Sequence, residues 1–160
     1  MDIRSHIPHA GERYVQSMRQ VPSNHYEYLL DLPSNMPEQH STFYSHLQYI
    51  PFGVIDKNGN IWSTLLCHPK VNIIQSNRLT ISTKISIHDP FVQAVISTQN
   101  EKNRYIAGVG VDFTNRRRNK LNGHIIRSNY NIDDNMLSLT IETYECMGNC
   151  PKYITIRKLI

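Results

Sequence analysis

An Asn-Gly pair at positions 58 and 59 restricts the possible folds of this chain more than any other feature. It stands between two short apolar segments, residues 51–56 and 61–67. A type I′ turn needs positive φ at both of its central residues, which Asn and Gly tolerate better than other residues. The pair therefore predicts a β-hairpin with a tight turn.

Further short strands make the expected fold mainly β. Residues 136–146 alternate apolar and polar side chains with a period of two, as a half-buried strand does. Strands are also predicted at residues 70–75, 78–83, 105–113 and 116–128. Because the predicted helices lie outside these runs, we expect an α+β fold, mainly β, built as a closed or split antiparallel barrel with peripheral helices.

Four segments predict helices. Residues 11–20 carry apolar side chains at helical spacing, and Pro37 suits the start of a second helix that runs toward residue 50. Asp89 suits the N-cap of a third. After Gly148 the chain is expected to turn and continue as a short helix, where Lys152 and the exposed N–H groups would favour an anion.

Composition limits the classes of function. We predict one domain over residues 1–160, with residues 1–50 as a helical N-terminal extension packed on the barrel. The apolar runs are too short to span a membrane and the N-terminus lacks a signal peptide, so we expect no membrane partner and a cytoplasmic location. A net charge of +4 without a basic, aromatic-interleaved surface argues against nucleic acid as a partner.

The cysteines are interpreted as structural or incidental. Their number, three, argues against a disulfide scaffold. Cys146 and Cys150 are one residue further apart than the cysteines of a C-x-x-C redox motif. No second Cys or His pair stands at a spacing that would complete a zinc site.

Two features of the strands at 105–113 and 116–128 suggest a ligand. Gly108 and Gly110 share one face and would let a backbone or a flat ligand approach closely. Arg116, Arg118 and Lys120 share a face as well, with Arg117 on the other. This basic ladder is either a solvated strand face or a set of phosphate ligands, and composition leaves both interpretations open.

Hydroxyl side chains near strand ends form the last candidate set, in which Ser63 precedes Thr64 and Ser82 precedes Thr83. Such groups satisfy phosphate oxygens in nucleotide sites, although they are common at strand ends in any case. Trp62 is interpreted as a core residue. Because the chain carries no hydrolase or P-loop signature, any enzymatic chemistry is expected to belong to a cofactor.

Five segments in this order resemble the pyridoxamine 5′-phosphate oxidase-related, FMN-binding split-barrel family: HAGERYVQ, PFGVIDKNGNIWSTLL, YIAGVGVDF, RRRNKLNGHI and GNCPKYITIRK. The last is similar to the closing Asn-Cys-Pro-Lys-Tyr-Ile signature of one branch of this family. The resemblance extends from about His9 to Arg157. Its closing signature and its basic strand are fairly specific, whereas the hairpin alone is not.

The resemblance implies a six-stranded antiparallel split barrel that pairs into a homodimer, with FMN at the dimer interface. It also implies a flavin-dependent oxidoreductase that acts on an unidentified small molecule. The cofactor-binding residues that it implies lie on strand ends, on the basic strand and in the closing signature: Ser63, Thr64, Ser82, Thr83, Arg117, Arg118, Lys120, Asn149 and Lys152.

The sequence also departs from this family. Lys120 stands where arginine is common, residues 67–72 replace a glycine-rich turn, and residues 87–88 lack the Ser-Arg-Lys run of the oxidase branch. A second hypothesis is therefore a degenerate barrel that serves as a non-catalytic binding or dimerisation module. Haem binding is a third, because such barrels include haem-handling relatives and the chain has eight histidines.

Overall fold

A computed structural model describes residues 10–20, 32–149 and 153–158 of the chain. The chain divides into two compact units, Met1–Leu32 and Pro33–Ile160. The first contains α1 (Ala10–Met18), which confirms the helix predicted there. The packing of residues 1–32 on the barrel and the single-domain assignment stay predictions. Within the described ranges, no helix combines the length and the apolar character that crossing a lipid bilayer requires.

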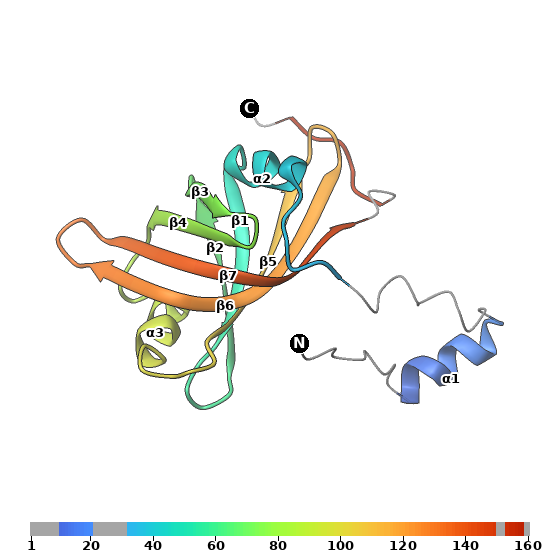
Figure 1. Cartoon of the computed structure of the whole chain (residues 1–160), viewed down its shortest axis with the longest axis horizontal. Coiled ribbons are helices and arrows are strands. Elements are labelled where there is room, and N and C mark those ends of the chain that lie inside the picture. The colour runs from blue at the N-terminus through green and yellow to red at the C-terminus, as the bar shows by residue number, and fades with distance from the viewer. Residues whose placement is uncertain (1–9, 21–31, 150–152, 159–160) are drawn as a thin grey trace. The chain divides into compact units, whose positions relative to one another are not determined.

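The second unit is built on one seven-stranded antiparallel sheet that curls into a barrel (Figure 1). The strands are β1 (Tyr49–Ile55), β2 (Ile61–Cys67), β3 (Lys70–Gln75), β4 (Arg78–Lys84), β5 (Tyr105–Asp112), β6 (Arg117–Asn131) and β7 (Met136–Asn149). They lie in the order β2-β1-β5-β6-β7-β4-β3. The mainly β, antiparallel fold is confirmed. The expectation of six strands is wrong, because both strands of the β3–β4 hairpin join the sheet through the pairing of β4 with β7.

The predicted hairpin is present, with β1 and β2 paired along their whole length. Its turn is not type I′, because Gly59 has a φ of +85° while Asn58 is not among the residues with positive φ. Asp56 instead organises a longer loop, in which its Oδ1 accepts the N–H groups of Asn58 and Asn60 at 2.8 and 2.9 Å. Hydrogen bonds from Trp62 and Asn60 lower the pKa of Asp56 to about 2. The carboxylate therefore stays charged at a lower pH than a free aspartate would, and it holds the loop.

The placement of Trp62 corrects a second expectation about this hairpin. Its side chain is not a core residue but is 39% exposed. The indole N–H donates to Oδ2 of Asp56 at 2.9 Å. Trp62 therefore stabilises the loop from outside the core.

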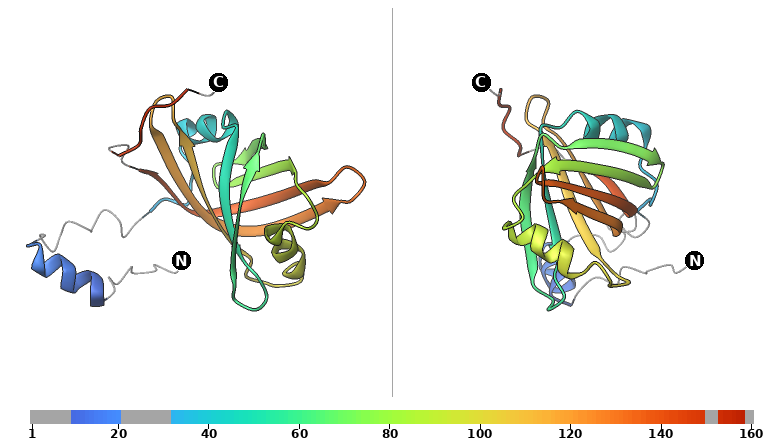
Figure 2. Two further views of the ribbon diagram at one scale, coloured as in Figure 1. Left: turned by 180° about the vertical axis from the view of Figure 1, so that it is seen from behind. Right: turned by 90° about the vertical axis from the view of Figure 1, so that its left-hand side faces the viewer.

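Two helices close the ends of the barrel (Figure 2). α2 (Glu38–Ser45) starts after Pro37 as predicted, but it ends before residue 50 because β1 begins at Tyr49. It buries Tyr44, whose hydroxyl donates to the carbonyl oxygen of Asn119 at 2.9 Å. α3 (Pro90–Ser97) packs against β1 and β2. Asp89 caps it as predicted.

Gly108 and Gly110 of β5 serve the core rather than a ligand. A Cβ at Gly108 would clash with the ring of Phe52, and one at Gly110 would lie 2.6 Å from side-chain atoms of Phe43 and Leu47. The expectation that a backbone or flat ligand approaches these glycines is therefore wrong. The core side chains already fill the space that the missing side chains leave.

The last two strands differ from the prediction at their ends. Arg116 lies in the preceding turn with a φ of +63°, so it does not share a strand face with Arg118. β7 runs through Gly148 to Asn149, which lies opposite Arg118. The predicted turn at Gly148 is therefore wrong, because β6 still offers a pairing partner there. The described residues 153–158 do not form the predicted helix.

The two faces of the sheet respond differently to added side-chain volume. Gly108→Ala should lower the free energy of unfolding by about 1–3 kcal/mol, the usual cost of overpacking a core. At Gly53 of β1 an added Cβ meets only the carbonyl oxygen of Trp62, at 3.7 Å, so Gly53→Ala should change this free energy by less than about 1 kcal/mol. Chemical denaturation followed by circular dichroism measures both values. Equal destabilisation by the two variants would contradict this assignment of faces.

Candidate ligand-binding site

A hollow of about 460 Å³ lies on the outer face of the sheet, over β1, β5 and β6. The outer face is the one that points away from the core, and strand alternation places Gly53 and Ile55 of β1 on it while Phe52 and Val54 are buried. The lining is mainly apolar and includes Ile61 of β2 and Tyr105 of β5. An open apolar hollow with a few polar groups is the usual form of a small-molecule site.

The floor of the hollow is formed by three members of a row of small side chains that crosses four strands, Gly53, Ala107 and Asn122. In register order the row reads Ser63, Gly53, Ala107 and Asn122. Neighbouring strands are about 4.8 Å apart, so the row extends about 14 Å across the strands. A flat ring system could lie on it without meeting a protruding side chain.

Larger side chains stand on both sides of this floor. The next outward row on one side of the floor consists of Ile61, Ile55, Tyr105 and His124. The next outward row on the other side consists of Leu65, Pro51, Val109 and Lys120. The floor is therefore a trough between two rows of bulkier residues.

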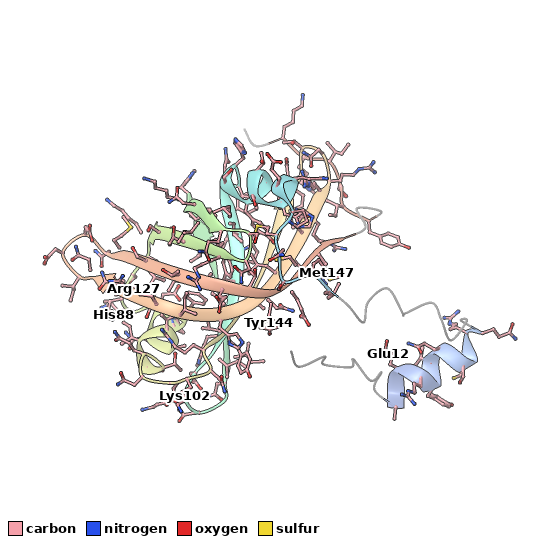
Figure 3. The ribbon with its side chains drawn as sticks, in the orientation of Figure 1. Glu12, His88, Lys102, Arg127, Tyr144 and Met147 are labelled. Carbon is pink, nitrogen blue, oxygen red and sulfur yellow. The ribbon has the colours of Figure 1, made fainter. Side chains whose placement is uncertain are left out.

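Three rings in tilted contact border the trough. The ring centroids of Tyr105 and His124 lie 4.8 Å apart, and those of His124 and Tyr144 lie 5.1 Å apart. Tyr144 belongs to β7 (Figure 3) and joins this ring cluster next to a β-bulge between Asn122 and Gly123. A Cβ at Gly123 would lie 2.5 Å from the carbonyl oxygen of Glu142. The bulge that places this aromatic border therefore depends on glycine.

Polar groups of β6 continue along the same face. Nδ2 of Asn122 donates to Oε2 of Glu145 at 2.7 Å. Lys120 is exposed and Arg118 is half-buried, and both point outward because Asn119 between them is buried. Along an extended strand they stand about 7 and 13 Å from Asn122. Cations thus lie off one end of the hollow, at a distance that an anionic tail of a ring ligand could reach.

Most of the predicted hydroxyl contacts have partners within the fold. Oγ1 of Thr64 donates to Oδ2 of Asp89 at 2.9 Å, and Oγ1 of Thr83 donates to the carbonyl oxygen of Cys67 at 2.9 Å. Ser82 faces Ser138 of β7, with their Oγ atoms 3.2 Å apart. These bonds join β2 to α3, β2 to β4, and β4 to β7. Of the four predicted hydroxyls, only Ser63 belongs to the row that forms the floor, and it lies next to the hollow rather than in its lining.

The N-terminus of α3 already holds a negative charge. Asp89 accepts the N–H of Phe91 at 2.8 Å as well as the hydroxyl of Thr64. A phosphate at this helix end would meet a like charge and lack the free donors that usually bind it. This end of the barrel is therefore a poor phosphate site.

The remaining predicted residues lie away from the hollow. Arg117 donates from Nη2 to the carbonyl oxygen of Gln39 at 2.7 Å, and its guanidinium carbon lies 5.0 Å from the centre of the Phe43 ring. It therefore links β6 to α2. Asn149 ends β7 opposite Arg118. The side chain of Asn149 and the whole of Lys152 lie outside the residues that the structure describes.

One chain does not bring all predicted residues together. Ser82 pairs through Ser138 with Asn129 of β6, whereas Arg118 lies near the other end of that strand. The stretch from 118 to 129 corresponds to about 36 Å of extended strand. A single phosphate could not contact both groups within one protomer.

The described cysteines differ in exposure. Cys67 is exposed, and Cys146 is buried as a free thiol. Burial raises the pKa of the Cys146 thiol, which lowers the fraction of the reactive thiolate. Cys150 lies outside the described residues. Among the residues that the structure describes, no three His, Cys, Asp or Glu side chains are grouped so as to hold a metal ion.

Sequence reasoning missed the residues that form the hollow. Gly53, Ala107, Tyr105 and Tyr144 were not among the predicted site residues. The alternation of side chains along β1 and β5 carried one signal for the hollow. Their outward positions are small or apolar, whereas a solvated face would carry polar residues. The register that aligns these positions came only from the structure.

Comparisons with known proteins identify the fold. No family model matches the sequence, and no curated protein matches it either. Among solved structures, a “putative pyridoxamine 5′-phosphate oxidase” from Lactobacillus delbrueckii aligns over 71% of this chain and 94% of its own, with 8% identity and a TM-score of 0.52. An F420 reductase aligns over 70% of this chain and 98% of its own, with 7% identity and a TM-score of 0.51. The chain shares the fold of these proteins.

Asp89 offers a test of the structural role assigned to the α3 end. Asp89→Ala removes both the N-cap and the acceptor of Thr64, so it should lower the free energy of unfolding by about 1–2 kcal/mol. Thr64→Val should cost less, because the cap remains. Thermal and chemical denaturation measure both variants. Undiminished stability of the Asp89 variant would show that the carboxylate is available for another role.

Proposed function

We propose that this chain binds FMN in the hollow over β1, β5 and β6 and acts as a flavin-dependent oxidoreductase on a small molecule. The floor formed by Gly53, Ala107 and Asn122, with Ser63 opposite Gly53 on the next strand, carries the proposal, because it offers a flat surface bordered by aromatic and apolar side chains. The shared fold with a protein described as a pyridoxamine 5′-phosphate oxidase and with an F420 reductase supports a redox cofactor of this kind.

The residues present fit a flavin nucleotide. A Cβ at Gly53 would meet only the carbonyl oxygen of Trp62, at 3.7 Å, so the fold does not fill the space above this glycine and leaves room for a ring. Asn122 places an amide at the edge of the floor, and Tyr105 and Tyr144 border it. Lys120 and Arg118 would hold the phosphate with charge-assisted hydrogen bonds. When bound, the flavin would supply hydride or electron transfer, and these residues would orient it and exclude water.

A homodimer forms part of this proposal. Apolar side chains surround the hollow, and Ile61 is 76% exposed, Leu65 50% and Ile55 39%. A second copy of the chain would cover them and enclose the flavin. Predicted residues that lie far apart in one chain, such as Ser82 and Arg118, could then approach the same cofactor from different protomers. We include in the proposal a cytoplasmic location and membership of the branch with the closing signature at 149–154.

Titration with FMN and with riboflavin separates the ring contacts from the phosphate contacts. Gly53→Leu should abolish binding of both, because the new side chain fills the floor. Lys120→Ala or Arg118→Ala should weaken FMN binding by about 1.5–3 kcal/mol and leave riboflavin binding unchanged. Quenching of flavin fluorescence measures the affinities. Thr140→Leu, which places the same leucine side chain on the outward face of the distant part of β7, is the control.

Failure of wild-type protein to bind FMN would overturn the proposal. Light scattering of the purified protein would then distinguish the alternatives. A stable dimer without flavin affinity would support a non-catalytic binding or dimerisation module. Identical FMN affinities for wild type and Gly53→Leu would place the flavin elsewhere on the chain.

A further inference from the structure

A second and larger cavity, of about 590 Å³, lies between α2, the β5–β6 turn and the C-terminal segment 153–158. It shares no lining residue with the hollow described above. Its volume is within the usual range of small-molecule sites. The proposed flavin site does not use it.

The walls of this cavity are aromatic and aliphatic. Tyr49 and Phe113 face it as a tilted pair with ring centroids 6.3 Å apart. Phe43 and Leu47 of α2 and Val111 of β5 complete the apolar part. Side chains of this kind contact a planar apolar ligand body favourably.

The charged side chains of the lining are predominantly cationic. Arg117, Arg157 and Lys158 carry positive charge, and Asp112 is the one carboxylate among the lining residues. Lys158 and Arg157 are exposed, so their head groups are free to turn toward a ligand. The excess of cations favours an anionic group on whatever the cavity binds.

Hydrogen bonds within the β5–β6 turn occupy the carboxylate of Asp112. Its Oδ1 accepts the backbone N–H and the hydroxyl of Thr114, at 2.9 and 2.6 Å. Its Oδ2 accepts Nδ2 of Asn115 at 2.7 Å. Asp112 is therefore committed to shaping the turn and does not form an ion pair with the cations of the cavity among the described residues.

The C-terminal segment is held at the mouth of the cavity by the backbone. The N–H of Arg157 donates to the carbonyl oxygen of Phe113 at 3.0 Å. Figures 1 and 2 show the segment beside the tip of the β5–β6 hairpin. Because this bond is made by the main chain, the Arg157 side chain is not needed to keep the segment in place.

We propose that this cavity binds a small aromatic anion, with its ring against Tyr49, Phe113 and Phe43. The anionic head, a carboxylate or a phosphate ester, would lie against Arg157, Lys158 and Arg117. Arginine suits both heads because its planar fork donates two parallel hydrogen bonds. In a chain that also binds flavin, such a ligand would be a substrate or an effector.

NMR titration of ¹⁵N-labelled full-length protein tests this site with benzoate, phenyl phosphate and the neutral analogue benzamide. Benzoate or phenyl phosphate should shift the amide signals of residues 42–49 and 111–117 in a saturable manner. Preference for one of the two identifies the head group. Benzamide should bind at least about tenfold more weakly, because it lacks the charge that the cations recognise.

The double variant Arg157→Ala/Lys158→Ala should raise the dissociation constant for the preferred anion about tenfold or more and leave the free protein's spectrum otherwise unchanged. Lys102→Ala, which removes an exposed cation elsewhere (Figure 3), is the control and should bind as wild type does. No saturable shift with either anion would overturn the proposal, as would equal affinity of the double variant and wild type. Displacement of the anion by FMN would also overturn it, because one site would then serve both ligands.

Discussion

The pairing of β6 with β7 is the constraint on which the rest of the barrel depends. β5 pairs with the first half of β6, from Arg117 to His124, and thereby connects β1 and β2 to the sheet. β4 pairs with the first half of β7, from Met136 to Glu142, and connects β3. The two halves of the sheet are therefore joined chiefly through one long ladder, with Thr83 and Cys67 providing a hydrogen bond across the other side.

This ladder bends where the candidate site lies. Register shifts occur between Asn122 and Gly123 and between Ile125 and Arg127. The first lets β7 present Tyr144 to the ring of His124 and Glu145 to Asn122. Bulges increase the local twist of a strand pair and redirect side chains. The feature that curves the sheet into a barrel therefore also shapes the outer face at the hollow.

Sequence patterns predicted the parts of this fold that depend on local chemistry. The Asn-Gly pair located the hairpin, alternation located β7, and Asp89 with Pro90 located the start of α3. The errors arose where a residue distant in the sequence determines the local structure. Gly148 continues in a strand because Asn119 lies opposite, and Gly108 is filled by Phe52 from another strand. The side chain of Asp56 replaced the expected turn type with a longer loop.

The candidate site was harder to predict from the sequence, because it too depends on residues that are distant along the chain. Arg118 and Lys120 could be placed on one face from alternation alone, since that is a property of a single strand. The floor of the hollow requires the register of four strands, which no local pattern specifies. Thr64 and Thr83 have the right chemistry for phosphate but point to acceptors within the fold. Side-chain type identified donors, and only packing showed which of them were already engaged.

The two glycines of neighbouring strands have different evolutionary consequences. Folding itself preserves Gly108, since any side chain there collides with Phe52. Gly53 has no such protection, because a larger residue there leaves the core untouched. Under the proposed function, a lineage of this barrel could therefore lose its flavin through one codon and still produce a stable protein. Position 53 would then record whether descendants of this chain have kept the binding function, independently of whether they have kept the fold.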